Sequence, residues 1–224
     1  MNNQTTPRGK FISFEGGEGV GKSTQVTLLR DHLTAEGYEV VVTREPGGTT
    51  GAEEIRQLLL SGDTDKWLPM TEVLLFYAAR VDHIERVIKP ALEAGKWVIS
   101  DRYADSSFAY QGAGHGLTQD TLKELHHIAT RNFWPDLTLV LDADVDHGLS
   151  RATEREAAVA ANNREDRFEN MAHDFHQRLR QAFLDIAAAN PVRCRVISAT
   201  GSISDVAQRI WQAVQNFDKG RQGE

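Results

Sequence analysis

The sequence predicts a three-layer α/β/α fold around a five-stranded parallel sheet. Five short β-rich runs are each followed by a helical pattern, and this alternation is typical of βαβ units. The runs are almost continuously apolar, as expected of strands that are buried on both faces. They occupy residues 10–15, 38–43, 96–101, 137–142 and 194–198.

Three amphipathic patterns predict the positions of helices. The first follows Ser23 and stops at Gly37, a residue type that commonly ends helices. The second places apolar residues on one face from Phe168 to Ile186, and the third does so from Ile203 to Phe217. Because these helices alternate with the predicted strands, they are expected to cover both faces of the sheet.

The composition predicts a single domain in a reducing compartment. The chain has 224 residues, of which 40% are hydrophobic, and no linker divides it. Acidic residues outnumber basic ones by 32 to 25, and the net charge of -7 argues against nucleic acid or an anionic membrane as the main partner. Cys194 is the only cysteine, which excludes internal disulfides and multi-cysteine metal sites. The N-terminal stretch lacks a signal-peptide core and no window resembles a membrane span, so we expect a cytoplasmic protein.

The segment "GGEGVGKS" (residues 16–23) matches the phosphate-binding pattern G-x-x-x-x-G-K-[ST]. It lies between a predicted strand and a predicted helix, which is the context that this motif requires. We therefore expect backbone N–H groups to hold the β-phosphate of a nucleotide, Lys22 to reach its β and γ oxygens, and Ser23 to bind Mg²⁺. These features indicate a P-loop NTPase. The guanine-reading string N-K-x-D does not occur, which argues against a regulatory GTPase.

Three other strings lie at the carboxyl ends of predicted strands or on the helix that faces those ends, where open α/β sheets bind ligands. They are "TREPGGT" (43–49), "LLFYAAR" (74–80) and "SDRYADSSFAYQG" (100–112). Arg44, Arg80 and Arg102 within them would form a local basic cluster in an otherwise acidic chain. Asp101 ends a predicted strand, so its carboxylate can reach the region of the Mg²⁺ ion.

With "EGGEGVGKSTQ", "TREPGGT", "FYAAR" and "DRYxxSSxAYQG" in this order and spacing, the chain resembles bacterial thymidylate kinases from Phe11 to about Phe217. The resemblance implies transfer of the γ-phosphoryl group of ATP to dTMP, giving dTDP and ADP in dTTP biosynthesis, with Mg²⁺ as cofactor. It also implies a homodimer. We expect residues 1–224 to form one nucleoside monophosphate kinase domain with a lid at about 151–167.

The same resemblance implies how dTMP is bound. Phe76 would stack on the thymine ring, and Arg80, one helical turn further, could donate to a base carbonyl. Tyr110 would crowd a ribose 2′-hydroxyl and so favour deoxyribonucleotides, and Arg102 would grip the acceptor phosphate with help from Arg56. The predicted substrate-binding residues are Glu18, Arg44, Pro46, Arg56, Phe76, Arg80, Arg102, Ser107, Tyr110 and Gln111.

Glu18 and Gly19 are unusual within a phosphate loop, since the first is an anion and the second adds no cation. The resemblance implies that Glu18 binds the 3′-hydroxyl of the acceptor sugar and that lid arginines supply the missing positive charge. The predicted catalytic residues are Lys22, Arg102, Arg155 and Arg164, with Arg167 pairing inside the lid. The predicted ATP-binding residues are Gly16, Gly17, Glu18, Gly19, Val20, Gly21, Lys22, Ser23, Thr24 and Arg151, and the predicted metal ligands are Ser23 and Asp101.

Two alternative functions stay open at this stage. A kinase for UMP or CMP would share the P-loop, although "FYAAR" and "SSxAYQG" describe a flat ring, a carbonyl and a crowded C2′. A switch protein that hydrolyses ATP slowly is disfavoured by the arginines of the acceptor pocket. His115 receives no metal or acid-base role, because no second histidine has metal-site spacing, and His126 and His127 are expected to be exposed helix residues.

Overall fold

The computed structural model describes residues 8–157 and 167–221, and it describes residues 152–157 and 219–221 by their backbone alone. Its sheet has five strands in the order β2-β3-β1-β4-β5, and every neighbouring pair is parallel. The predicted fold class is confirmed, and each strand coincides closely with a predicted run. The strands are β1 (Phe11–Glu15), β2 (Val40–Arg44), β3 (Trp97–Asp101), β4 (Leu137–Asp142) and β5 (Cys194–Ser198).

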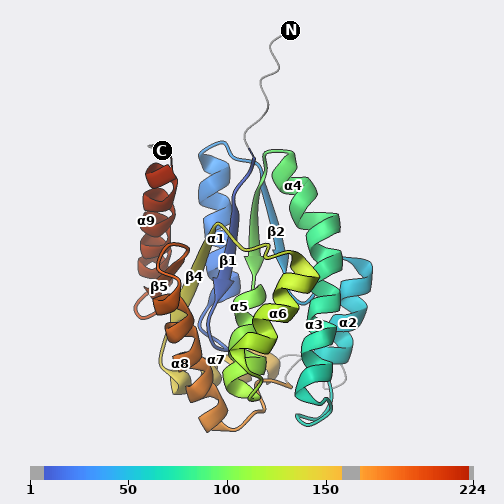
Figure 1. Cartoon of the computed structure of the whole chain (residues 1–224). Coiled ribbons are helices and arrows are strands. Elements are labelled where there is room, and N and C mark those ends of the chain that lie inside the picture. The colour runs from blue at the N-terminus through green and yellow to red at the C-terminus, as the bar shows by residue number, and fades with distance from the viewer. Residues whose placement is uncertain (1–7, 158–166, 222–224) are drawn as a thin grey trace.

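Helices cover both faces of the sheet (Figure 1). The α-helices are α1 (Lys22–Ala35), α2 (Thr50–Leu60), α3 (Pro69–His83), α4 (Lys89–Glu93), α5 (Ala104–Ser107), α6 (Gln119–Thr130), α7 (Val145–Ala157), α8 (His173–Ala189) and α9 (Ile203–Arg221). Two π-helical segments, η1 (Ile84–Ile88) and η2 (Phe108–Gly114), continue α3 and α5.

The two faces of β1 differ in polarity. Ile12 and Phe14 point to the face covered by α1 and α9, where they join the largest apolar cluster of the described residues. The opposite face carries Phe11 but also the fully buried Ser13 and Glu15. Period-two alternation along the strand therefore places a buried carboxylate at the end of β1, directly before the P-loop.

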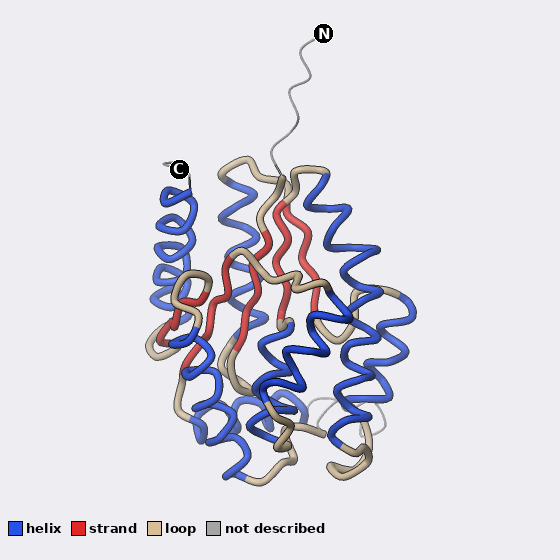
Figure 2. Tube along the Cα trace, viewed as in Figure 1, coloured by secondary structure: helices blue, strands red, loops and turns tan. Residues whose placement is uncertain are grey.

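The sheet order brings three loops together at one edge. Figure 2 shows the strands side by side in the middle of the fold, and every neighbouring pair is parallel, so all strands end at the same edge. Since β3 lies between β1 and β2, the P-loop after β1, the segment after β2 and the segment after β3 are neighbours. Strand order thus brings the P-loop next to two of the strings singled out from the sequence, those around Arg44 and Arg102. The third string lies on α3, which brings Arg80 to the same cavity.

The boundaries of two helices can be compared with the prediction: one is confirmed and one is corrected. Helix α1 ends just before Gly37, which has φ 90° and lets the N–H of Tyr38 donate to the carbonyl of Leu33 at 3.0 Å. The helix predicted from Phe168 begins only at His173, because the preceding residues form turns packed against the cavity described below.

The prediction that His126 is exposed is wrong. Its side chain is buried, and its ring nitrogens lie 3.2 Å from the hydroxyl groups of Tyr77 and Thr130. The face of α6 that carries His126 packs against α3, and Trp134 lies against the imidazole ring. Burial lowers the pKa of His126 to about 3, and Arg80 and Arg193 act in the same direction. No helix in the described ranges has the length and apolar character that a bilayer span needs.

Candidate active site

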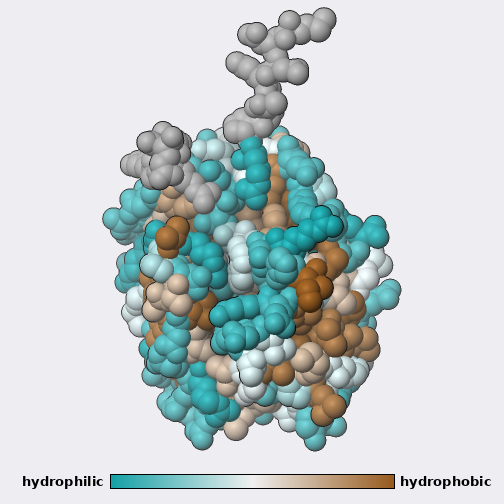
Figure 3. Space-filling model, viewed as in Figure 1, coloured by the Kyte–Doolittle hydropathy of each residue, from teal (hydrophilic) through white to brown (hydrophobic). Residues whose placement is uncertain are grey.

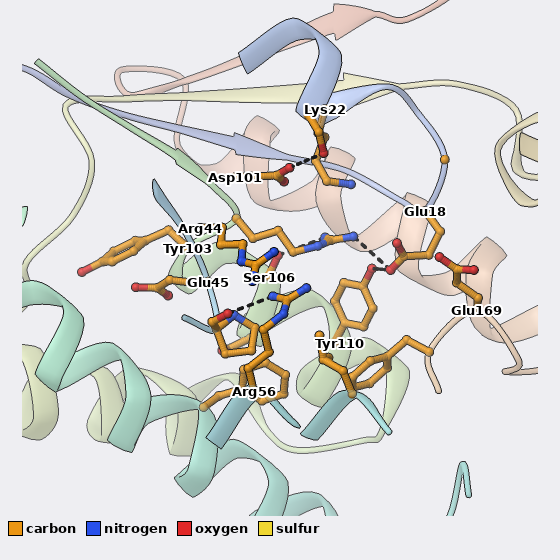
Figure 4. A pocket seen from close by; sticks show the side chains of 18 of the residues that line it. Glu18, Lys22, Arg44, Glu45, Arg56, Asp101, Tyr103, Ser106, Tyr110 and Glu169 are labelled. Carbon is orange, nitrogen blue, oxygen red and sulfur yellow. Dashed lines mark hydrogen bonds and ion pairs between the residues drawn. The ribbon is translucent and has the colours of Figure 1, made fainter. Parts of the chain in front are cut away.

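One cavity of about 520 Å³ lies at the carboxyl edge of the sheet, between the P-loop and helices α2, α3 and α5. It is lined at one end by Lys22, Ser23 and Asp101 and at the other by Phe76 and Arg80. Figure 4 shows Glu18 and Glu169 on one side of this cavity and Glu45 and Tyr103 on the opposite side. The residues predicted to bind the phosphoryl donor and those predicted to bind its acceptor therefore line one cavity.

The backbone of the P-loop explains the glycine at position 19. Gly19 has φ 64°, and a Cβ atom there would lie 1.8 Å from the carbonyl oxygen of Gly148 in α7. Any side chain at this position would collide with backbone, which cannot move aside as a flexible side chain could. The absence of a cation at this position of the loop thus follows from close packing of the loop on α7.

Lys22 folds back over the phosphate loop. Its Nζ donates to the carbonyl oxygens of Gly17 at 2.7 Å and Gly16 at 3.2 Å. Burial lowers the pKa of Lys22 to about 8, and the Arg102 guanidinium adds to this effect. A bound polyphosphate would favour the charged form of the amine, because an opposite charge raises the pKa of an ammonium group.

Ser23 and Asp101 form a small oxygen site beside the lysine. The hydroxyl of Ser23 donates to Oδ2 of Asp101 at 2.8 Å, and both residues line the cavity. Within the described residues there is no cluster of three or more potential His, Cys, Asp or Glu ligands. This donor set fits Mg²⁺, which typically takes one or two carboxylates, substrate phosphates and several waters, and does not require an all-protein cage.

Glu18 is held by two partners from the segment after β3. Nη2 of Arg102 donates to Oε1 of Glu18 at 3.0 Å, and the hydroxyl of Tyr110 donates to the same oxygen (Figure 4). Burial alone would raise the pKa of Glu18, but Arg102 and Lys22 outweigh it and lower the pKa to about 2. The carboxylate is therefore ionised at neutral pH and turned toward the acceptor half of the cavity.

Arg102 has a left-handed backbone conformation, and Glu15 at the end of β1 holds the residues that follow it. The φ of Arg102 is 70°, a left-handed conformation that costs on the order of 1–3 kcal/mol for a residue other than glycine. Glu15 accepts the N–H of Tyr103 at 2.8 Å and the hydroxyl of Ser106 at 2.6 Å, which ties the segment directly after Arg102 to β1. Burial and the neighbouring Asp105 raise the pKa of Glu15 to about 8.

The far end of the cavity contains aromatic and basic residues. Phe76 on α3 is partly buried, and its ring centroid lies 6.2 Å from that of Phe168. Arg80 is buried against Glu45, with Nε donating to Oε2 at 2.7 Å. Two further arginines line the cavity: Arg44 pairs with Glu53 at 3.0 Å, and Arg56 donates to the carbonyl of Pro46 at 2.8 Å.

The structure brings nearly all the described predicted site residues to this cavity. Its lining includes Glu18, Gly19, Gly21, Lys22, Ser23, Thr24, Arg44, Pro46, Arg56, Phe76, Arg80, Asp101, Arg102, Ser107, Tyr110, Gln111 and Arg151. Gly16, Gly17 and Val20 of the same loop line instead a smaller pocket against β4 and α8. Asp142, which also ends a strand, pairs with Arg180 at 2.7 Å and is not part of the main lining.

Of the arginines predicted for the catalytic role and for pairing in the lid, the structure describes the side chain of Arg167 but not those of the two predicted catalytic arginines. The side chains of Arg155 and Arg164 lie outside the described residues. Arg167 is described and is buried: it pairs with Glu72 and donates to the backbone carbonyls of Asp63 at 3.0 Å and Thr64 at 2.9 Å. Among the described residues, the expected pairing inside the lid is therefore replaced by pairing with α3 and with the loop between α2 and α3.

Sequence reasoning missed several lining residues, namely Glu45, Leu60, Tyr103, Ser106, Phe168 and Glu169. Glu45, Tyr103 and Ser106 lie inside the strings that were singled out, so their place in the chain was a usable signal. Phe168 and Glu169 gave no such signal, because they were assigned to the start of a helix.

Comparisons with known proteins agree with this geometry. The sequence profile of the thymidylate kinase family matches residues 14–210. The thymidylate kinase of Rhizorhabdus wittichii is 49% identical over 209 residues, covering 93% of this chain and 98% of the relative. That of Caulobacter vibrioides is 50% identical over 206 residues, covering 89% and 96%.

A solved structure supports the same relationship. The crystal structure of thymidylate kinase from Ehrlichia chaffeensis superposes with a TM-score of 0.73 at 34% sequence identity, covering 93% of this chain and 100% of that chain. The match includes the five-stranded parallel sheet and extends well beyond the P-loop motif, which many unrelated proteins share. The chain therefore belongs to the thymidylate kinase family.

Proposed function

We propose that this protein transfers the γ-phosphoryl group of ATP to dTMP, giving dTDP and ADP in dTTP biosynthesis. The observation that carries the proposal is the single cavity in which Lys22 and Ser23 lie opposite Phe76 and Arg80. In-line phosphoryl transfer requires the two nucleotides to meet in one such space. The relatives described above are all named thymidylate kinase, which supports dTMP over UMP or CMP as the acceptor.

The donor half would bind the phosphates of ATP through the backbone of the P-loop and the amino terminus of α1. Lys22 would release the carbonyls of Gly16 and Gly17 to reach the β and γ oxygens. Mg²⁺ would be held by Ser23 and Asp101 and would neutralise charge on the phosphates. Arg151 lines the same cavity and would contact ATP.

The acceptor half would bind dTMP through its base, sugar and phosphate. Phe76 would stack on thymine, and Arg80 and Ser107 would face its polar edge. Gln111 supports this assignment, because its Oε1 is buried without a hydrogen-bond partner in the described part of the chain and could accept the N3–H of thymine. Glu18 would accept the 3′-hydroxyl, and Tyr110 would crowd C2′.

Three arginines would attract the acceptor phosphate. Arg102 lies between the P-loop and Tyr110, where it could contact phosphates of both nucleotides, and Arg44 and Arg56 line the same side as Pro46. The positive charge that the loop cannot carry at Gly19 would come from Arg155 or Arg164. These groups, with Lys22, would stabilise the charge on the transferring phosphoryl group.

The surface of α3 supports a homodimer. Met70, Leu74 and Val81 are exposed on this helix, with Leu74 at 50% of its accessible area, and Leu68 precedes it at 75%. Figure 3 shows hydrophobic side chains gathered on the side of the molecule where α3 lies. We propose that this stripe is the dimer interface of a cytoplasmic enzyme whose residues 1–224 form one kinase domain with a lid at about 151–167. Light scattering should then show a dimer for the wild type and a monomer for Leu74→Glu.

The proposed activity is tested by a coupled ATP-to-ADP assay with Mg²⁺. The protein is incubated with dTMP, dUMP, UMP, CMP or no acceptor, and products are identified by chromatography. We expect rapid turnover with dTMP, formation of dTDP in equal amount to ADP, and loss of activity when Mg²⁺ is chelated. Turnover with UMP or CMP instead, or ADP release without an acceptor, would contradict the proposal.

A further inference from the structure

A buried polar network surrounds the base end of the cavity. It joins Thr43 on β2, Glu45 in the following loop, and Arg80 and His83 on α3. Oε2 of Glu45 accepts from Nε of Arg80 at 2.7 Å, and its Oε1 lies 3.0 Å from Nδ1 of His83. Nε2 of His83 lies 2.7 Å from the hydroxyl oxygen of Thr43. All four side chains are buried, so water does not compete for these contacts.

Protein groups occupy most donors of Arg80. A guanidinium has five N–H donors. Within the described residues, Nε donates once to Glu45, Nη1 once to Ser107 at 3.2 Å, and Nη2 twice, to Ser107 at 3.1 Å and to the carbonyl of Tyr103 at 3.3 Å. Four of the five donors are thereby used. The remaining N–H is on Nη1, and Arg80 lines the cavity.

Glu45 is the group that makes this arrangement possible. A guanidinium buried without a counter-ion is costly, whereas a paired and hydrogen-bonded one is tolerated. Burial would raise the pKa of Glu45, but Arg80 and His83 outweigh it and lower the pKa below its ordinary value. The carboxylate therefore stays charged next to the arginine and fixes the Nε side of its plane.

His83 fixes the second oxygen of Glu45. The tautomer that satisfies every atom carries its proton on Nδ1, which donates to Glu45, while Nε2 accepts from the hydroxyl of Thr43. Since Thr43 belongs to β2, this chain of hydrogen bonds holds the Glu45 carboxylate in a fixed position relative to the sheet. A Cβ atom at Gly48 would lie 2.5 Å from the His83 ring, so the adjoining loop also confines the imidazole.

Resting on the proposed dTMP kinase activity, we propose that Glu45 and His83 are positioning residues for base recognition, which hold Arg80 so that one Nη1 donor faces the acceptor base. A single fixed N–H favours a carbonyl at C4 of the pyrimidine, as in thymine. It disfavours cytosine, whose C4 amino group is itself a donor. Neither Glu45 nor His83 needs to touch the substrate for this selection to operate.

The experiment compares Glu45→Gln, His83→Gln and Arg80→Ala with the wild type, using dTMP and dCMP as acceptors. For Glu45→Gln we expect KM for dTMP to rise about tenfold while kcat changes less than about threefold, because the carboxylate acts on binding geometry and not on the phosphates. The ratio of kcat/KM for dTMP to that for dCMP should fall toward the value of Arg80→Ala. His83→Gln should shift both quantities in the same direction by a smaller factor.

The matched control is Asp105→Asn, which breaks another buried ion pair. Asp105 pairs with Arg193, and Asp105 is not among the residues that line the cavity. It should lower the unfolding midpoint, as Glu45→Gln does, but leave the KM for dTMP and the dTMP to dCMP ratio unchanged. A direct dTMP titration by calorimetry provides the binding readout without turnover.

The outcomes separate this inference from the proposed function. If the wild type phosphorylates dTMP but Glu45→Gln and His83→Gln, both folded, keep its KM and its selectivity, the positioning role is wrong. The same holds if Asp105→Asn alters selectivity as much as Glu45→Gln. If Glu45→Gln does not fold, His83→Gln alone decides. If the wild type does not phosphorylate dTMP, the proposed function itself fails.

Discussion

The two halves of the cavity are built in different ways. The donor half is built mainly on one continuous segment, the P-loop, whose backbone N–H groups and glycine conformations create the anion site. Lys22 and Ser23 of this segment, Asp101 at the end of β3 and Arg151 on α7 add side-chain chemistry. The acceptor half is assembled from side chains on α2, α3, η2 and the segments after β2 and β3, and its key groups are buried ion pairs such as Arg80 with Glu45. Substitutions that add atoms, such as glycine to alanine, should therefore disturb the donor half. Substitutions that remove a side-chain partner should disturb the acceptor half.

Between the halves lies the turn at Arg102. Its guanidinium donates to the carbonyl of Gly16 at 2.9 Å and to Glu18, and it lies over the ring of Tyr110. This turn is fastened to β1 by Glu15. Both halves of the cavity therefore depend on the strained backbone of Arg102 and on the buried carboxyl group of Glu15.

The largest expected effect concerns the charge that the donor loop lacks. Because Gly148 leaves no room for a side chain at position 19, the cation must come from another segment, for which Arg155 and Arg164 are our candidates. The double variant Arg155→Ala with Arg164→Ala should lower kcat by roughly 10³-fold and raise the KM for dTMP only slightly. Steady-state kinetics measure both constants, and near-normal turnover would place the cation elsewhere.

A second prediction concerns the pH dependence of Glu15. Burial raises its folded-state pKa from 4.5 to about 8, so the folded protein retains a proton that the unfolded chain releases in this range. The stabilisation is fully present below pH 4.5 and is lost as pH rises through about 8. Glu15→Gln mimics the neutral acid, so it should match the wild type near about pH 5 and gain on the order of a few kcal/mol relative to it by about pH 8.5.

Urea unfolding of both proteins at these two pH values measures the difference. A constant difference between Glu15→Gln and the wild type across the range would show that the carboxyl group does not titrate on unfolding as stated.

The third prediction tests whether the donor half is sensitive to added atoms. Gly19→Ala and Gly21→Ala both force alanine into a left-handed backbone, at φ 64° and 95°. Only Gly19→Ala creates a collision, since a Cβ atom at Gly21 has nothing within 4 Å. Gly19→Ala should therefore be destabilised by roughly 2 kcal/mol more than Gly21→Ala. Equal unfolding free energies for the two variants would mean that α7 moves away at little cost.

The smallest effects are expected at Tyr110, in the acceptor half. Tyr110→Ala should relax the preference for dTMP over its ribose counterpart by about tenfold, because the ring no longer crowds C2′. Tyr110→Phe should keep this preference, although it removes the hydrogen bond to Glu18 and so raises the pKa of that carboxyl. Competition assays with both acceptors measure the ratio. The steric explanation fails if both variants keep the wild-type ratio.

The sequence by itself determined the sheet, the P-loop and most of the candidate site. Apolar runs indicated the strands because parallel strands are buried on both faces, and the G-x-x-x-x-G-K-[ST] pattern indicated the phosphate site because its geometry is local. The strings around Arg44 and Arg102 converged as expected, since parallel strands end at one edge of the sheet, and Arg80 joined them from the facing helix α3.

Only the tertiary structure decided which partner each charged group has. The pairing of Glu45 with Arg80, the clamp of Glu15 on the Arg102 turn and the contact of Gly19 with Gly148 each join segments that are more than 30 residues apart in the chain. The same is true of the burial of His126 and the late start of α8, which depend on what packs against these residues. Periodicity and motifs report local preferences, whereas desolvation, steric exclusion and charge pairing arise from neighbours that the chain supplies only when it is folded.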